Sequence, residues 1–547
     1  MSRTRLLGSL GCVVLLAAPA AAQQADSVAA LIRARAETLQ TDGSIVVQGV
    51  RLRARDALPA FYAQREYQPA WTDPTRLAAL QQAVRASADD GLNPSDYLLE
   101  SLERLTPLAT SPHAPAALRA DVDLLATEAL TRLAFSLRYG KVNPANIGAA
   151  WGVQPATPPG PPPILEQLVS SDTLAGAVAA LAPRHPLYLR LRTELARYRA
   201  AQAAGGWPPI DPGPDLEVGM TDPRVPAVRR RLAATDDLPT TAADSGGERY
   251  DRALSQAVAH FQARLGLAPD GVLGPRTRAE LNAPPMLRIK TLRVNLERAR
   301  WVLPGLGRTF VAVNIPAYRA YFVRDDSLVW SGRAVVGEPY LQTPEFQSRI
   351  TTLVLNPTWT VPPQILTDEV LPDILRDSTY LARNGMQVLD GTGEVVNPTD
   401  VDWSKYDGRT LPYRIVQAPG SQNPLGRVKF LFPNAYAVYL HDTPARALFQ
   451  QSRRTFSHGC IRVQHPMQLA LALLNDSTWT EAALDSVVAR ETETPIALPD
   501  PVPILILYWT AWPAEDGALN FRPDVYGRDG AVLTALNAPF SFSAAAQ

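Results

Sequence analysis

The stretch Tyr439-Leu440-His441-Asp442-Thr443-Pro444 is followed, after a short connection, by Ser457-His458-Gly459-Cys460-Ile461-Arg462-Val463. The residues before His441 have the apolar and aromatic character of a strand, so we expect His441 at a strand end. A hairpin-like return would bring it opposite Cys460. His458 lies two residues before Cys460, a spacing that puts both side chains on one face of an extended strand unless Gly459 turns the chain.

These residue types together suit a thiol nucleophile. The thiolate is the reactive form of cysteine, and a reference pKa of about 8.5 leaves little of it near neutral pH. A neighbouring histidine, either His441 or His458, would accept the thiol proton and return it to a leaving amine. Backbone amides around Gly459 and Cys460 would form an oxyanion hole, and Arg462 would bind a carboxylate.

The N-terminal segment predicts export. Arg3 and Arg5 precede the apolar residues 6–18, and the small residues 20–22 that follow are typical of a cleavage site. We therefore expect a signal peptide over residues 1–22 and a periplasmic mature chain. Cleavage would remove Cys12, which leaves Cys460 without a disulfide partner in the chain. The longest later apolar run, residues 502–512, is too short for a membrane span and predicts a buried strand.

Around the two quoted stretches the sequence is rich in strand-forming residues. Apolar, β-branched segments occur at residues 310–315, 320–323, 328–336, 349–355 and 436–440. We assign residues 287–547 to one predominantly β domain. A more polar segment, about residues 365–413, predicts a helix-and-turn insertion that caps the site. The C-terminal segment Tyr508 to Tyr526 is expected to add a strand to this domain.

Two helical units precede the β domain. Residues 26–210 are rich in Ala, Leu and Arg at helical spacing and predict a helical scaffold domain. Residues 217–283 predict a small three-helix module, in which one helix ends at Gly266 and Pro275 opens the next. The predicted fold class is therefore multidomain α+β.

The charge balance limits the function classes. The chain has 547 residues, with 53 basic and 53 acidic side chains, so its formal net charge is zero. A nucleic-acid-binding protein normally carries a basic excess, and this balance argues against that class.

The two stretches resemble the signature of L,D-transpeptidases of the YkuD type, and the domain order is similar to the large periplasmic YcbB form. Supporting stretches are Asn314-Ile315-Pro316-Ala317-Tyr318, Thr343-Pro344-Glu345-Phe346, Leu355-Asn356-Pro357-Thr358-Trp359, and Pro424-Leu425-Gly426 with Lys429-Phe430. Residues 217–283 resemble a peptidoglycan-binding module through Phe261-Gln262, Gly266-Leu267, Asp270-Gly271, Gly274-Pro275 and Thr277. Arg462 agrees with the large periplasmic form, whereas Asp442 departs from the Gly that many members carry.

The resemblance implies roles for the site residues. Cys460 would be the nucleophile and His441 its proton acceptor and donor, with His458 and Gly459 as further catalytic residues. Ser457, Tyr439 and Arg462 would contact the substrate. No cofactor and no metal are implied.

The resemblance also implies a reaction and partners. The thiol would attack the third-residue carbonyl of a tetrapeptide stem and release D-alanine, and the side-chain amine of another stem would resolve the thioester into a 3–3 cross-link. Carbapenems would acylate the same thiol. The expected partners are peptidoglycan stem peptides and, as a further hypothesis, other cell-wall synthases.

Three alternatives stay open at this point. A zinc site from Cys460, His441, His458 and His465 is the main rival chemistry, although the familiar ligand spacings are missing. Resolution of the thioester by water or by another acceptor would make the protein an L,D-carboxypeptidase or a protein-to-wall ligase. A non-catalytic wall-binding scaffold would retain its function after Cys460→Ala.

Overall fold

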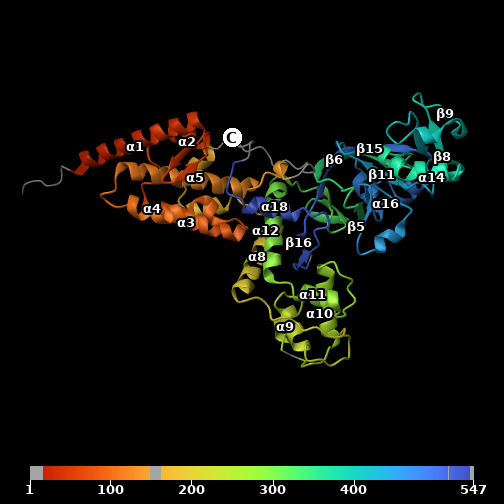
Figure 1. Cartoon of the computed structure of the whole chain (residues 1–547), viewed down its shortest axis with the longest axis horizontal. Coiled ribbons are helices and arrows are strands. Elements are labelled where there is room, and N and C mark those ends of the chain that lie inside the picture. Colours follow the sequence, from red (N-terminus) through yellow and green to blue (C-terminus); the bar gives the residue numbers. More distant parts are fainter. Residues whose placement is uncertain (1–16, 148–161, 245, 515, 543–547) are drawn as a thin grey trace, which may run out of the picture.

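The computed structural model describes residues 17–147, 162–244, 246–514 and 516–542. It shows a helical N-terminal region, a small three-helix module and a sheet-rich C-terminal domain, as the sequence predicts (Figure 1). Most of the predicted signal peptide, Cys12 included, lies outside the described residues, and helix α1 (Ala17–Asp42) crosses the predicted cleavage site. Among the described helices, none combines the length and the apolar character needed to cross a membrane.

The N-terminal region is a bundle around helix α5 (Ala116–Tyr139), which is buried along most of its length. The region also contains a β1–β2 hairpin (Ile45–Val47, Val50–Leu52) and the helices α2 (Ala57–Gln64), α3 (Pro74–Ala86), α4 (Leu99–Ala109), α6 (Pro162–Ser170), α7 (Leu174–Ala179) and α8 (Pro186–Ala203). Asp123 of α5 accepts hydrogen bonds from the backbone N–H groups of Ala70 and Trp71, both at 2.9 Å. This buried carboxylate fixes the loop before α3 to the central helix.

The small module consists of α9 (Val225–Ala233), α10 (Arg252–Arg264) and α11 (Pro275–Leu281). Gln262, the second residue of the Phe-Gln pair, has a structural role in the module. Its side-chain amide bridges the turn between α10 and α11. The amide nitrogen donates to Asp270 Oδ1 at 2.7 Å and to Thr277 Oγ1 at 3.0 Å, and the amide oxygen accepts from Gly271 N at 2.8 Å.

Helix α12 (Pro285–Val302) connects the module to the sheet domain and packs along α8. Its Asn295 donates to Thr510 Oγ1 at 2.8 Å and accepts from Thr510 N at 3.0 Å. Asp529, at the start of α18 (Asp529–Asn537), lies 2.5 Å from Arg298 of α12. The C-terminal part of the chain therefore returns to α12.

The sheet domain is built on strands whose pairing closes into a ring. In ring order they are β3 (Phe310–Asn314), β4 (Arg319–Arg324), β5 (Ser327–Gly337), β14 (Ile461–Val463), β12 (Leu440–His441), β11 (Val428–Leu431), β6 (Phe346–Leu355) and β15 (Thr494–Leu507), which pairs with β3 again. Strand β13 (Thr455–Ser457) pairs in parallel with the end of β5. Alternate residues such as Val311, Phe322 and Ile504 form the core, and α16 (Pro466–Leu474) packs on β5 and β15, with α17 (Glu481–Val488) beside it.

The insertion has its own apolar core, which includes Leu366, Val370 and Val388. It contains α13 (Pro363–Ile365), a π-helical segment η6 (Leu366–Val370), α14 (Leu371–Arg376) and α15 (Tyr380–Arg383). It also contains an antiparallel sheet of β7 (Trp359–Thr360), β10 (Arg414–Gln417), β8 (Met386–Leu389) and β9 (Val395–Val396). The expectation of helices and turns missed this sheet because strands of two to four residues give too short a period-two pattern.

The expectation that the C-terminal segment adds a strand to the sheet domain is wrong. Residues 508–526 do not add a strand to the ring, because β16 (Ala511–Pro513) and β17 (Leu519–Phe521) pair only with each other in the described structure. This hairpin packs against α8, α10 and α12, and thereby joins the scaffold, the module and the sheet domain. The strand contributed to the ring from the C-terminal region is β15, immediately before it.

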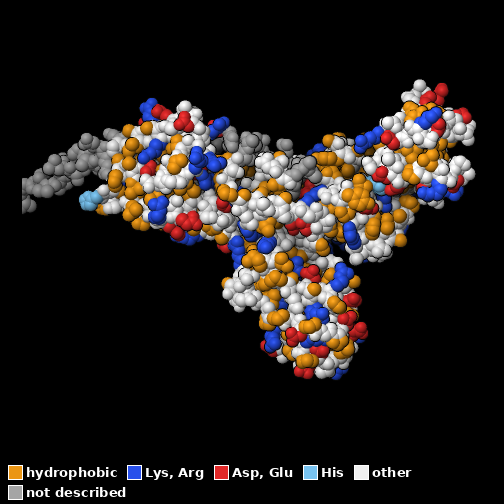
Figure 2. Space-filling model, viewed as in Figure 1, with side chains coloured by type: hydrophobic (Ala, Val, Ile, Leu, Met, Phe, Trp, Pro, Cys, Tyr) orange, Lys and Arg blue, Asp and Glu red, His pale blue; other side chains and the backbone are white. Residues whose placement is uncertain are grey.

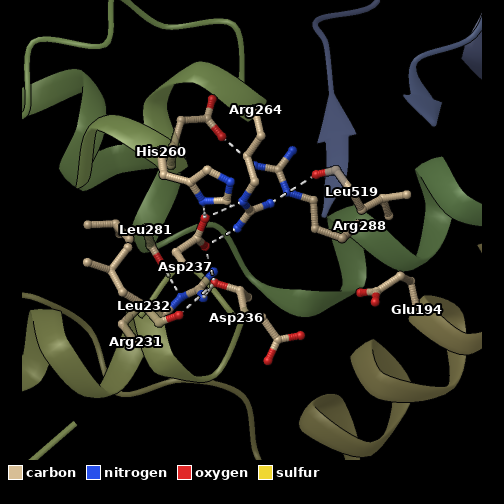
Figure 3. Close-up of polar contacts among 12 residues, drawn as sticks. Glu194, Arg231, Leu232, Asp236, Asp237, His260, Arg264, Leu281, Arg288 and Leu519 are labelled. Carbon is tan, nitrogen blue, oxygen red and sulfur yellow. Dashed lines mark hydrogen bonds and ion pairs between the residues drawn. The ribbon is translucent and has the colours of Figure 1, made fainter. Parts of the chain in front are cut away.

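Figure 3 shows the polar contacts between the module and this hairpin. Asp237, whose side chain is fully buried, lies 2.5 Å from Arg264, and Arg264 donates to the carbonyl oxygen of Leu519 in β17 at 3.2 Å. His260 of α10 also contacts Asp237. On the face drawn in Figure 2, basic and acidic side chains are interspersed, in line with the zero net charge.

Candidate active site

Strands β12 and β14 bring the two quoted stretches together. They run parallel, with Leu440 paired to Ile461 and His441 paired to Arg462. The expected hairpin-like return is therefore wrong: the chain leaves β12 and comes back to pair in the same direction. Ile461 N also donates to Tyr439 O at 3.1 Å, which extends the pairing toward Cys460.

The alternation of the strands decides which side chains share a face. Leu440 and Ile461 are fully buried in the ring core, so the residues on either side of each point the other way. His441 of β12 and Arg462 of β14, with Tyr439 and Cys460 immediately before these strands, therefore lie on the same face of the pair. The sequence predicted this group of residues, and the parallel register decides how they are arranged.

His441 is buried, and backbone carbonyl groups accept hydrogen bonds from its ring. Its Nδ1 lies 2.5 Å from the carbonyl oxygen of Asp442. A carbonyl only accepts, so Nδ1 carries the proton and Nε2 is the basic nitrogen. Burial, and then the charge of Arg462, lower the pKa of His441 to about 3, against backbone hydrogen bonds that involve Asp442 and Pro424. The ring is therefore neutral near pH 7 and able to accept a proton.

Cys460 is the free cysteine of the described structure and is partly buried. Burial raises the pKa of its thiol, opposed by hydrogen bonds with Tyr439 and by the charge of Arg462. The Tyr439 ring also packs edge-on against His441, with ring centroids 5.6 Å apart. A thiol with a raised pKa needs a base before it attacks a carbonyl, and the neutral imidazole of His441 lies on the same face.

The loop before Cys460 is held by internal hydrogen bonds. Gly459 has φ = +107°, a backbone conformation that favours glycine. Ser457 Oγ accepts from Gly459 N at 3.2 Å and donates to Cys460 O at 2.5 Å. Thr343 Oγ1 donates to Gly459 O at 2.8 Å and accepts from Gly337 N at 2.9 Å.

Two consequences follow for the predicted site residues. The Gly459 N–H, expected as an oxyanion donor, is already directed at Ser457, and Ser457 contacts the loop backbone. Thr343 joins the site without having been predicted as a site residue. Its stretch was quoted as part of the resemblance, but nothing in the sequence alone showed which backbone group its hydroxyl would reach.

His458 turns toward the insertion, because the chain bends at Gly459. Its Nε2 lies 3.0 Å from Glu369 Oε1, and Glu369 belongs to η6. The insertion therefore contributes a carboxylate to the rim of the site. Glu369 was not predicted as a site residue, because a single acidic residue in a polar segment does not indicate which side chain it will contact.

Arg462 is the cation of the site and is partly buried. Its Nε is enclosed without a hydrogen-bond partner, and no described residue forms an ion pair with it. Burial lowers the pKa of the guanidinium, opposed by Cys460 and by Glu369. A partly desolvated guanidinium without a protein anion is suited to a substrate carboxylate.

The proposed zinc ligands do not form one cluster. Within the described ranges, no three or more His, Cys, Asp or Glu side chains are grouped as a metal site. His465 is exposed and precedes α16 with φ = +54°.

Comparison with known proteins agrees with this geometry. Residues 308–488 match the family model of the L,D-transpeptidase catalytic domain, a region that includes Cys460, His441 and the insertion. The chain contains an L,D-transpeptidase catalytic domain. Residues 221–281 match a peptidoglycan binding domain, and residues 56–195 match a scaffold domain.

One curated relative is similar to part of this chain. It is a protein of Haemophilus influenzae named "Putative L,D-transpeptidase", 37% identical over 238 residues. The match covers 44% of this chain and 48% of the relative, so it spans about half the length of each.

Two solved structures are also similar to this chain at low identity. An L,D-transpeptidase from Xylanimonas cellulosilytica is 18% identical, covers 54% of this chain and 100% of its own, and has a TM-score of 0.19. An L,D-transpeptidase from Mycobacterium smegmatis is 14% identical over 37% of this chain and 58% of its own, also with a TM-score of 0.19. The domain assignment rests on the sequence matches.

Proposed function

We propose that this protein is an exported L,D-transpeptidase that forms 3–3 cross-links in peptidoglycan by acyl transfer through Cys460. One observation carries the proposal: Cys460 shares a strand-pair face with a neutral histidine whose Nδ1–H is bound, so that Nε2 is left as the base. The comparisons support the domain class, and the reaction and the residue roles are our inference.

The first half-reaction needs a proton transfer and a leaving group. His441 Nε2 takes the proton from Cys460 Sγ, and the thiolate attacks the carbonyl of the third residue of a tetrapeptide stem. The tetrahedral intermediate collapses to a thioester, the C–N bond to D-alanine breaks, and His441 returns its proton to the leaving amine. We assign oxyanion stabilisation to the Cys460 N–H, because the Gly459 N–H donates to Ser457.

The second half-reaction reverses these roles. The side-chain amine of another stem attacks the thioester and gives a proton to His441. The C–S bond breaks, and the leaving Cys460 thiolate takes that proton from His441. Arg462 would bind a stem carboxylate, and the rim formed by Glu369 and His458 would hold the insertion over the bound peptide. Binding of the wall by the module at residues 217–283 would keep the domain on its polymer.

The test is the intact mass of the protein after incubation with purified tetrapeptide muropeptides. The unmodified chain should gain a thioester adduct, release D-alanine and form 3–3 dimers, whereas Cys460→Ala should do none of these. D-alanine release without dimers, in the presence of an amine acceptor, would favour a carboxypeptidase. Dimers or released D-alanine from Cys460→Ala would overturn the role of the thiol, and unaltered wall binding without any chemistry would leave a scaffold.

A further inference from the structure

Asp442 is a buried charge directly beside the proposed base. Only 1% of its side chain is exposed. Oδ2 accepts a hydrogen bond from the backbone N–H of Arg427 at 2.9 Å. Oδ1 accepts no hydrogen bond from the described residues but forms an ion pair with Arg446, 2.8 Å from its Nη2. The Nε of Arg427 is 3.9 Å from the same carboxylate. The two guanidinium groups are half-exposed, so they offset part of the desolvation cost of the buried anion.

The backbone of the same residue holds His441. The Asp442 carbonyl oxygen accepts from His441 Nδ1 at 2.5 Å, and the Asp442 N–H donates to Val428 O at 2.9 Å. Its side chain and both of its backbone polar groups are therefore engaged, each with a different partner. Rotation of this peptide would release the imidazole contact and the carboxylate contacts together.

The Asp442 carboxylate leaves no room for a side chain at position 426, where the sequence has glycine. A Cβ added at Gly426 would lie 2.5 Å from Cγ of Asp442, and the residue has φ = +61°. A side chain at this position would collide with the carboxylate and also strain the backbone. A cavity of about 260 Å³ lies next to the Asp442 carboxylate and is lined in part by Arg427, Asp442 and Arg446. A displaced carboxylate has room to move into this cavity.

We infer that Asp442 is a positioning residue for His441: its carboxylate, clamped by Arg427 and Arg446, fixes the peptide whose carbonyl holds Nδ1–H and so keeps Nε2 as the basic nitrogen. The tautomer of a histidine is set by the hydrogen bond at its other nitrogen, so an anchored carbonyl selects one tautomer. The catalytic consequence rests on the proposed function, but the tautomer itself does not.

The experiment displaces the carboxylate in two independent ways. Asp442→Ala removes it, and Gly426→Ala pushes it aside. Each variant has a matched control: Asp485→Ala removes another carboxylate near Arg427, with 3.6 Å between Nη1 and Oδ1, and Gly385→Ala adds a Cβ at φ = +60° with nothing within 4 Å. The readouts are the imidazole ¹⁵N shifts of His441, which distinguish its tautomers, the rate of Cys460 acylation by tetrapeptide stems, and thermal unfolding.

We expect Asp442→Ala and Gly426→Ala to lose the single Nδ1–H tautomer and to slow acylation by about 10- to 100-fold, the effect of a misplacement near 1 Å. Both controls should stay within twofold of the unmodified chain. An unchanged tautomer and rate in Asp442→Ala would overturn the inference. Should that variant unfold, Asp442→Asn, which retains an acceptor for the Arg427 N–H, decides on the same readouts. A fixed tautomer in an unmodified chain that no stem acylates would refute the proposed function and leave the positioning role standing.

Discussion

His441 and His260 are the same side chain in two opposite environments. His441 is buried, faces a backbone carbonyl and lies beside the cation Arg462, and these surroundings lower its pKa to about 3. His260 is more exposed and has a carboxylate at each nitrogen: Nδ1 is 2.9 Å from Asp237 and Nε2 is 3.0 Å from Asp516. The hydrogen bond to Asp237 is the main cause that raises the pKa of His260.

The difference shows that the partners of a histidine, more than its presence, decide its chemistry. A carbonyl at one nitrogen leaves the other free to accept a proton, as general base catalysis requires. Two carboxylates are both satisfied only by the imidazolium, which donates from both nitrogens. His441 is therefore suited to chemistry, and His260 is suited to joining the module to the β16–β17 hairpin (Figure 3).

The largest expected effect is on activity. His441→Gln should slow acylation of Cys460 by about 10²- to 10⁴-fold, because it removes the proposed general base. His260→Gln is the matched control and should leave the rate within twofold, since His260 contacts only the module–hairpin junction among its known partners. Mass spectrometry of the thioester over time measures both rates. Equal losses in the two variants would mean that the contrast between the histidines is not catalytic.

A smaller effect, on stability, is expected at the junction. Arg264→Ala should destabilise the module by about 3 kcal/mol, because it leaves the buried Asp237 carboxylate without its main cation. Arg230→Ala is the control: its guanidinium is 4.0 Å from Asp244 and both side chains are exposed, so little change is expected. Differential scanning calorimetry would resolve the module transition. Equal midpoints for the two variants would contradict the assignment of this ion pair, and acylation of Cys460 should be unaffected in both.

The two histidines should give stability changes of opposite sign with pH. His441 has a pKa of about 3 when folded and about 6.5 when unfolded, so the unfolded chain binds more protons and stability falls as the pH drops through this window. The raised pKa of His260 gives a contribution that is complete below about pH 6.5 and is lost as the pH rises through the folded value.

Unfolding midpoints against pH would test these signs. Below pH 6.5 the unfolding midpoint of His441→Gln should decline less than that of the unmodified chain. The midpoint of His260→Gln should lie furthest below that of the unmodified chain at low pH, and this difference should shrink as the pH rises. A gap for His260→Gln that widens with pH would contradict the two-carboxylate account.

The smallest expected effect is at a third histidine. Glu369→Gln removes the charge that lies 3.0 Å from His458 and should change the KM for tetrapeptide stems by up to about fivefold, because half-exposed pairs contribute at most about 1 kcal/mol. The value of kcat should change less than KM. Asp373→Asn, which removes a carboxylate 2.7 Å from Arg376 elsewhere in the insertion, is the control. A fall in kcat without a change in KM would assign Glu369 to the chemistry instead of the rim.

Three of the ring strands were predictable because their residues alternate or are β-branched over five or more positions. The segments at 310–315, 328–336 and 349–355 correspond to β3, β5 and β6. Two of the three helices of the module, α10 and α11, were predictable from Gly266 and Pro275, which end one helix and begin the next. The insertion sheet and the β16–β17 hairpin were missed, since their strands are too short for a pattern.

The sequence by itself determined the domain order and the set of residues near the thiol: Cys460, His441, Tyr439 and Arg462. Local propensity and residue chemistry act within a few positions, and they suffice for those conclusions. Only the tertiary structure decided the parallel register of β12 and β14, the contact of Glu369 with His458, and the clamp on Asp442. These depend on residues far apart in the chain, whose meeting is set by how the ring closes and how its core packs.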